Sequence, residues 1–176
     1  ERVRLAIVGS GPAGLSAASR AAALGLSHIL LEKADHLSDT IYKYQKGKHV
    51  MATPSALVLR SDLDFDAGKR EAVLETWDSQ IARAGVKVRL RADVTAIAGE
   101  KGAFVLALKD SEEVQADAVV LAIGTQGNPN LLTCPGGALP HVQYQLDDPD
   151  EYQNESIAVI GGGDAGIENA LGLVAG

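Results

Sequence analysis

Two glycine clusters of identical spacing are the residues whose types point to the most specific chemistry. The first follows an apolar run, 3–8, and has the pattern G-x-G-x-x-G over Gly9, Ser10, Gly11, Pro12, Ala13 and Gly14. In this pattern the first glycine permits a tight turn, the second lets a pyrophosphate approach the backbone, and the third lets a helix pack closely on a strand. The following helix N-terminus would offer free N–H groups to phosphates. The cluster therefore predicts a dinucleotide-binding turn.

An acidic residue stands at the position where such a turn needs one. Glu32 ends the apolar run 28–31, about eighteen residues after Gly14. A carboxylate there would accept hydrogen bonds from a ribose. The alternative is a glycine-rich turn followed by a chance surface glutamate.

The second cluster repeats the motif near the end of the chain. The apolar run 157–160 leads into Gly161, Gly162, Gly163, Asp164, Ala165 and Gly166. One chain would then hold two dinucleotide sites, unless the second is a degenerate copy that no longer binds. The residue that separates NAD from NADP is expected about twenty positions further on, beyond residue 176.

The patterns around these motifs predict the elements that position them. Residues 3–8 predict a buried parallel strand, and the alanine-rich stretch 13–24 predicts a helix that returns the chain to a strand over 28–31. Further elements are predicted as a helix over 68–84, strands over 86–90, 94–98, 104–108, 118–123 and 157–160, and a helix over 165–174. Of these, the strands from 86 to 108 would form an antiparallel meander. The stretch 34–66 is predicted as an irregular functional loop, and 125–155 as a crossover.

Together these elements predict the α/β class. The expected fold is Rossmann-like, with a parallel central sheet, an antiparallel β-meander insertion and the start of a second Rossmann unit.

Composition excludes several other classes of protein. The net charge of −7 argues against a nucleic-acid partner, because phosphates need a basic surface. The single cysteine, Cys134, forms neither an internal disulfide nor a four-thiolate metal site, so we expect no metal and a reducing, cytoplasmic location. No apolar run approaches the roughly 20 residues of a membrane span.

The ordered set of three segments resembles the two-dinucleotide-binding-domain flavoproteins of the thioredoxin-reductase-like group, in the pyridine nucleotide-disulfide oxidoreductase superfamily. The segments are VGSGPAGLSAA with the following LLEK, then ADAVVLAIGTQGNP, and then VIGGGDAGIENAL. The resemblance implies that the first segment binds FAD and that the second closes the FAD site and leads into the NAD(P) domain. The third would bind the nicotinamide nucleotide, NAD(P)H.

The resemblance also assigns residues to each cofactor. Those expected to bind FAD are Gly9, Ser10, Gly11, Pro12, Ala13, Gly14, Glu32, Lys33, Thr40, Val94, Ala122 and Gly124. Those expected to bind NAD(P)H are Gly161, Gly163, Asp164, Ala165, Gly166 and Glu168. Thr40 lies with Asp39 and Ile41 where the loop of this family approaches the flavin. Glu168 either faces the nicotinamide, as in the family, or is an ordinary carboxylate in the first helical turns.

The implied domains are an FAD-binding domain over 1–127, a crossover over 128–155 and the beginning of an NAD(P)-binding domain over 156–176. In the family, a returning segment with a Gly-Asp motif completes the FAD domain after the NAD(P) domain. We therefore expect the 176 residues to belong to a longer polypeptide. The apolar side chains of 157–174 would otherwise stay largely unpaired.

Cysteine usage narrows the branch of the family. Thioredoxin reductases carry C-x-x-C before the second glycine motif, whereas 133–155 holds only Cys134. The pattern is closer to bacillithiol-disulfide-reductase-like or ferredoxin–NADP-reductase-like flavoproteins, to which the segment 144–152, with its DDPDxY core, is also similar. Cys134 has no obvious basic neighbour that would activate a thiol, so we interpret it as an ordinary loop cysteine.

Several other residues have an ordinary structural interpretation. Trp77 is expected in the core, on the apolar face of the helix 68–84. The three histidines without metal-ligand spacing or an obvious partner are expected to be structural or exposed; they are His28, His36 and His141. The basic stretch 43–49 is either a solvated loop or a contact for phosphates or an acidic partner; its basic residues are Lys43, Lys46, Lys48 and His49.

The leading functional hypothesis is an FAD-dependent oxidoreductase that passes hydride from NAD(P)H through flavin to a disulfide, a quinone or a protein acceptor. No side-chain acid or base is strictly required for the first half-reaction, so no catalytic residue is assigned. The acceptor would be a small molecule or a protein, and the assembly is compatible with a homodimer. A flavin monooxygenase is a second enzyme hypothesis. Those proteins carry an aromatic signature with His and Trp between their two glycine motifs, and because no tryptophan follows Trp77 in this sequence, this hypothesis is less supported. A non-catalytic nucleotide-binding sensor is the third hypothesis.

Overall fold

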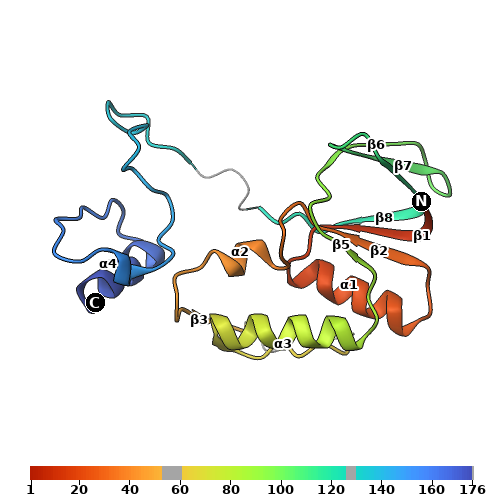
Figure 1. The fold of residues 1–176 in the computed structure, drawn as a ribbon, viewed down its shortest axis with the longest axis horizontal. Coiled ribbons are helices and arrows are strands. Elements are labelled where there is room, and N and C mark those ends of the chain that lie inside the picture. The colour runs from red at the N-terminus through yellow and green to blue at the C-terminus, as the bar shows by residue number, and fades with distance from the viewer. Residues whose placement is uncertain (53–60, 126–129, 176) are drawn as a thin grey trace.

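A six-stranded sheet organises the part of the chain up to residue 121 (Figure 1). The computed structural model describes residues 1–52, 61–125 and 130–175. In sheet order the strands are β5 (Val88–Arg89), β2 (His28–Leu31), β1 (Arg2–Val8), β8 (Glu113–Leu121), β7 (Phe104–Leu108) and β6 (Val94–Ala98). The pairs β5–β2, β2–β1 and β1–β8 are parallel, whereas β8–β7 and β7–β6 are antiparallel. The predicted mixed fold, with a parallel core and an antiparallel meander, is confirmed.

The strands that form the antiparallel meander differ from those predicted. We expected 86–90 to pair with 94–98, but β5 instead pairs in parallel with β2, with Leu30 opposite Val88. The true meander is β6, β7 and β8. The reason is the helix between β2 and β5, which returns the chain so that β5 runs in the direction of β2. Alternating polar and apolar residues mark a half-exposed strand but do not identify its neighbour.

Two helices pack on one face of the sheet, α1 (Pro12–Ala23) and α3 (Arg70–Arg83) (Figure 1). α1 begins at a proline in its first turn and is rich in alanine, and Gly85 follows α3 with a φ of +66°, as expected of a C-terminal glycine. Trp77 is only 4% exposed, and its indole N–H donates to the carbonyl of Asp64 at 2.9 Å. The predicted core position of Trp77 is confirmed.

On the opposite face of the sheet, apolar side chains from the parallel strands and from the meander strands form one cluster. Alternate residues of β1 and β2, such as Ala6 and Ile29, turn to this face and pack with residues of β7 and β8, such as Leu106 and Val114. The sheet is therefore buried on both faces near the C-terminal ends of β1 and β2, where the first glycine motif begins.

The stretch 34–66 is more ordered than predicted. It contains a short helix, α2 (Asp39–Tyr42), and a strand, β3 (His49–Val50), that pairs antiparallel with β4 (Gly68–Lys69). Part of this predicted loop, 53–60, lies outside the described residues, as does 126–129 of the predicted crossover.

The second glycine motif has its helix but not its strand. The helix α4 (Asp164–Ala175) confirms the prediction, and a 3-10 turn, η1 (Pro149–Glu151), precedes it. The predicted strand 157–160 is wrong: it joins no sheet in the described chain, and Ile160 is 72% exposed. A parallel strand takes its backbone hydrogen bonds from neighbouring strands, and the described residues supply none beside 157–160.

Candidate dinucleotide-binding site

The first glycine turn lies between the C-terminal end of β1 and the start of α1. Gly9 has a φ of +98°, and a Cβ there would meet the carbonyl oxygen of Ala122 at 2.5 Å. A Cβ at Gly14 would lie 1.8 Å from the carbonyl oxygen of Gly9. Both positions therefore require glycine, one for the turn and one for the contact between helix and turn.

Gly11 is different, because the space beside it is open. A Cβ at Gly11 would meet no atom within 4 Å. Gly11 is the N-cap of α1, has no side-chain cap and is followed by no acidic residue in the first turn. The first N–H groups of a helix have no partner within the helix and carry partial positive charge. An open, uncapped and uncharged helix start of this kind fits a diphosphate.

Glu32 is buried beside this turn at the end of β2, with 6% of its surface exposed. Its Oε2 accepts hydrogen bonds from the backbone N–H of Ser10 at 3.0 Å and from the Ser10 hydroxyl at 2.5 Å. Its Oε1 accepts from the N–H of Ala34 at 2.9 Å. These donors hold a carboxylate next to the glycine turn, where the sequence predicted a ribose-binding acid.

Ser38 completes this cluster, although it is not among the residues that the sequence predicts for the site. Ser38 is 2% exposed with a φ of +58°. Its N–H donates to the Ser10 hydroxyl at 2.9 Å, and its own hydroxyl donates to the Ser10 carbonyl at 3.2 Å. A serine in the left-handed region is uncommon, and here two hydrogen bonds to Ser10, 28 positions earlier, accompany this conformation. No sequence signal marks this pairing.

The other predicted FAD residues lie at varied distances from the turn. Ala122 contributes the backbone that faces Gly9, and Thr40 is exposed on α2, two positions after Ser38. Of the three remaining residues, Lys33 and Gly124 are exposed, and Val94 packs against the core on the meander side.

The second glycine turn repeats the local geometry of the first. Gly161 has a φ of +116°, and a Cβ at Gly166 would lie 2.2 Å from the carbonyl oxygen of Gly161. Gly163 is open, as Gly11 is. The N–H of Ile167 donates to the Gly163 carbonyl at 3.0 Å, and the equivalent bond in the first turn measures 2.9 Å. The two motifs therefore share a backbone conformation as well as a spacing.

Asp164 and Ala165 are exposed at the start of α4, and Glu168 forms an ion pair. Lys48 Nζ lies 2.6 Å from Glu168 Oε2 and 4.9 Å from the ring centre of Tyr44. The residue expected at the nicotinamide is therefore bound to the basic stretch that follows α2.

Other lysines of the basic stretch 43–49 also pair with acids of this chain. Lys46 Nζ lies 3.0 Å from Asp148 and 3.5 Å from Asp150. The hydrogen bond to Asp148 raises the pKa of Lys46, and the same bond lowers the pKa of Asp148. Lys43 pairs with Asp39 at 2.9 Å. These ion pairs lie within the chain, and Lys43 and Lys46 remain 51% and 56% exposed, so a role of this stretch in binding phosphates or an acidic partner stays a prediction.

Two histidines have the partners that the sequence did not indicate. His28 is buried, with Nδ1 bound to the Leu26 carbonyl at 2.7 Å and Nε2 accepting from the N–H of Lys87 at 3.3 Å. His36 contacts the carboxylates of Asp35 and Asp39, and its hydrogen bond lowers the pKa of Asp35. His141 and Cys134 are exposed, and the described residues contain no group of three or more acidic, histidine or cysteine side chains suited to a metal.

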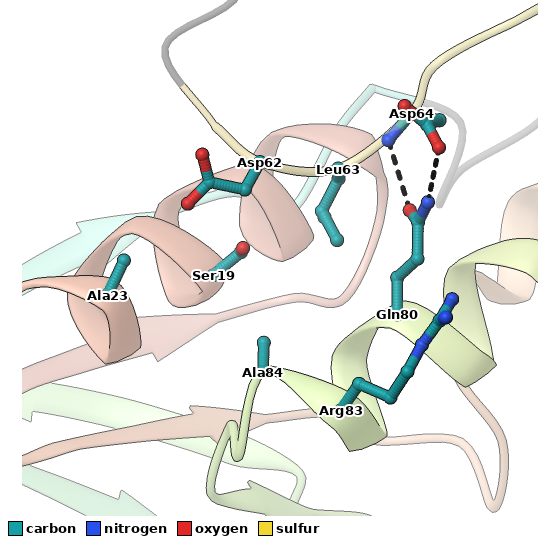
Figure 2. A pocket seen from close by; sticks show the side chains of 8 residues that line it. All are labelled: Ser19, Ala23, Asp62, Leu63, Asp64, Gln80, Arg83 and Ala84. Carbon is teal, nitrogen blue, oxygen red and sulfur yellow. Dashed lines mark hydrogen bonds between the residues drawn. The ribbon is translucent and has the colours of Figure 1, made fainter.

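A surface pocket of about 470 Å³ lies apart from the turn (Figure 2). Its lining comes from α1, α3 and the stretch 61–64, and consists of Ser19, Ala23, Asp62, Leu63, Asp64, Gln80, Arg83 and Ala84. Gln80 spans one side, donating to the Asp64 carboxylate at 2.6 Å and accepting from its N–H at 3.0 Å. Because a helix rises 1.5 Å per residue, Ser19 lies about 12 Å from Gly11 along α1. The pocket is therefore separate from the dinucleotide site.

The comparisons with known proteins agree with this geometry. The family model of the pyridine nucleotide-disulphide oxidoreductases matches residues 6–176, so the chain belongs to that family. Ferredoxin–NADP reductase of Ignicoccus hospitalis is 28% identical over 95% of this chain and 51% of its own length. Thioredoxin reductase of Helicobacter pylori is 27% identical over 96% of this chain and 51% of its own length. The chain spans about half the length of the curated relatives it matches.

Solved structures share the fold over nearly the whole chain. Bacillithiol disulfide reductase of Bacillus cereus has a TM-score of 0.85 at 26% identity, covering 99% of this chain and 56% of that protein. A flavin monooxygenase of Stenotrophomonas maltophilia has a TM-score of 0.73 at 18% identity, covering 99% of this chain and 55% of that protein. At the latter identity the likeness concerns the fold alone. The resemblance to thioredoxin-reductase-like flavoproteins is confirmed. The described residues contain no helix long and apolar enough to cross a membrane.

Proposed function

We propose that this chain supplies the FAD site and the first part of the NAD(P)H site of an FAD-dependent oxidoreductase. The single observation that carries the proposal is the repeated turn geometry, in which Gly9 and Gly14 are matched by Gly161 and Gly166. Two such turns in one member of this family fit two dinucleotides.

The residues around the first turn fit FAD, as opposed to a mononucleotide. The open space at Gly11 and the start of α1 suit the pyrophosphate, and Glu32 suits the adenosine ribose. FMN has neither a pyrophosphate bridge nor an adenosine ribose, so it would leave these groups without a ligand. The proposed domain limits are those of the sequence: 1–127, 128–155 and 156–176, with the first boundary outside the described residues.

When bound, the flavin accepts hydride from reduced nicotinamide and passes electrons to an acceptor. The residues of this chain contribute binding and orientation. The start of α1 would place the pyrophosphate, Glu32 would fix the ribose, and the second turn with α4 would place the nicotinamide nucleotide. None of these steps needs a side-chain acid or base, so the proposal names no catalytic residue.

The acceptor is proposed as a disulfide or a redox protein, following the activities named for the relatives, or as a quinone, as the sequence hypothesis allows. The sequence given has one cysteine, so a dithiol that relays electrons is not formed within these 176 residues. A homodimer and a cytoplasmic location are further proposals that rest on the resemblance and on cysteine usage.

Anaerobic mixing of the full-length protein with NADH and with NADPH tests the proposal. We expect bound FAD to be bleached within seconds by at least one of them. Tight binding of flavin and pyridine nucleotide without bleaching would support the sensor hypothesis instead. Bleaching followed by oxygen-dependent hydroxylation of an added substrate would support the monooxygenase hypothesis.

A further inference from the structure

Ser10 lies between the first two glycines of the first motif, and its polar groups are already bound inside the protein. The residue is 0% exposed. Its N–H and hydroxyl both donate to Glu32 Oε2, its hydroxyl oxygen accepts from the N–H of Ser38, and its carbonyl accepts from the Ser38 hydroxyl. A hydroxyl has one proton to donate, so Ser10 has no donor left for a cofactor.

We propose that Ser10 is a positioning residue: its hydroxyl aims the Glu32 carboxylate at the adenosine ribose and fastens the segment that begins at Ser38 to the glycine turn. The inference rests on the proposed FAD function and deepens it. It also changes the role expected for Ser10, from a residue that contacts FAD to one that acts through Glu32.

The hydrogen bonds around Glu32 determine which oxygen serves the ribose. A carboxylate oxygen accepts about two hydrogen bonds. Oε2 accepts two, both from Ser10, whereas Oε1 accepts one, from Ala34. Among the described residues no other group donates to Oε1, so one of its acceptor sites is open, and the bonds to Oε2 hold it in place. Charge-assisted O–H···O⁻ bonds of about 2.5–2.7 Å are strong, and the 2.5 Å bond from the Ser10 hydroxyl is of this type.

The same hydroxyl joins the turn to α2. The N–H of Ser38 donates to it, although 28 residues separate the two serines. α2 starts immediately after Ser38 and carries Thr40, which is expected near the flavin. Ser10 therefore connects the groups expected at the adenosine ribose, the pyrophosphate and the flavin side.

The choice of nucleotide sugar tests this role without depending on stability. Full-length protein is stripped of flavin, reloaded with FAD, and titrated with ADP or with 2′-deoxy-ADP, so that displacement of FAD reports the FAD site alone. In the wild type we expect ADP to compete about tenfold better than 2′-deoxy-ADP, because the site is built to bind the missing hydroxyl. In Ser10→Ala we expect this ratio to fall below about threefold, because Glu32 loses the hydroxyl bond and keeps only the bonds from the backbone N–H groups of Ser10 and Ala34. A general loss of stability would weaken both competitors equally and leave the ratio unchanged.

A double-mutant cycle for FAD affinity adds an independent test. We expect Ser10→Ala alone to weaken FAD binding by about tenfold or more. On a Glu32→Ala background the same change should cost less than about threefold, because Ser10 then has no carboxylate to position. The exposed Ser79→Ala is a control for an unrelated serine and should leave FAD affinity unchanged.

Either of two results would overturn the inference. One is a ratio of ADP to 2′-deoxy-ADP affinity that is unchanged in Ser10→Ala. The other is a double variant whose loss of FAD affinity equals the product of the losses in Ser10→Ala and Glu32→Ala. If Ser10→Ala does not fold, Ser10→Cys, which keeps the size but donates weakly, should give an intermediate ratio, and a wild-type ratio there would equally refute it. Failure of the wild type to bind FAD would instead refute the proposed function.

Discussion

Replacing Gly11 by alanine should impair cofactor binding, whereas replacing Gly14 by alanine should impair folding. The two glycines lie three positions apart in one motif, yet their surroundings differ. A methyl group at Gly11 would meet no protein atom within 4 Å, whereas one at Gly14 would lie 1.8 Å from the Gly9 carbonyl oxygen. We expect Gly11→Ala to fold and lose FAD, and Gly14→Ala to lose stability.

The magnitudes follow from these contacts. A Cβ–oxygen separation below 3.0 Å is essentially never seen, so Gly14→Ala must move α1 or the turn by more than 1 Å. α1 buries Leu15 and Ala18 completely, and such a shift disturbs that packing at a cost of about 3 kcal/mol. Gly11 has ordinary extended dihedral angles, so alanine there costs about 0.5–1 kcal/mol as a poorer N-cap.

The effect on the cofactor should run in the opposite order to the effect on stability. The methyl group of Gly11→Ala would occupy the position proposed for the pyrophosphate. We expect its FAD affinity to fall at least about 100-fold, which corresponds to about 2.7 kcal/mol. Urea unfolding of the flavin-free proteins measures stability, and quenching of flavin fluorescence on titration measures affinity.

Two outcomes would refute this reasoning. One is Gly11→Ala that retains FAD within a few-fold of the wild type, which would show that no phosphate lies against this backbone. The other is equal destabilisation by both substitutions, which would show that the contacts of the two glycines do not differ as described.

Three further predictions concern other parts of the chain. Cys134→Ser should change the rate of flavin reduction by NAD(P)H less than about tenfold, or 1.4 kcal/mol of barrier, in stopped-flow mixing, because hydride transfer needs no thiol. Trp77→Phe should cost about 1–3 kcal/mol in urea unfolding, since it removes the bond to the Asp64 carbonyl and leaves a small cavity. The hydrogen bond from the Gly47 N–H lowers the pKa of Glu71 in the folded protein. The ionised carboxylate therefore stabilises the fold at pH values above its pKa in the unfolded chain, and this stabilisation is lost as the pH falls through the lowered pKa of the folded state. Glu71→Gln should therefore lower the melting temperature slightly near about pH 7 and not near about pH 2, and equal shifts at both would contradict this.

The sequence was most informative where a residue's role depends on its near neighbours. The glycine spacing anticipated the positive φ of Gly9 and Gly161 and the tight contacts of Gly14 and Gly166. These properties arise within one strand–turn–helix unit, so the order of residues is enough to predict them. The position of Glu32 next to the turn was predictable for the same reason, because a βαβ unit brings the ends of its two strands together.

Features that depend on distant partners were not predictable. The alternation in 86–90 indicated a strand, but only the crossover through α3 decides that it pairs with β2. The apolar run 157–160 indicated a strand, but the described chain offers it no neighbouring strand. Ser38 and Lys48 are ordinary polar residues in sequence, and their roles come from Ser10 and Glu168, which lie far away along the chain.

The most direct test of the central claim is a crystal structure of the full-length protein with its bound flavin. We predict FAD with its pyrophosphate within hydrogen-bond distance of the first N–H groups of α1, over Gly11, and with the adenosine ribose on Glu32 Oε1. A pyrophosphate located elsewhere, or a flavin without adenosine, would contradict the account.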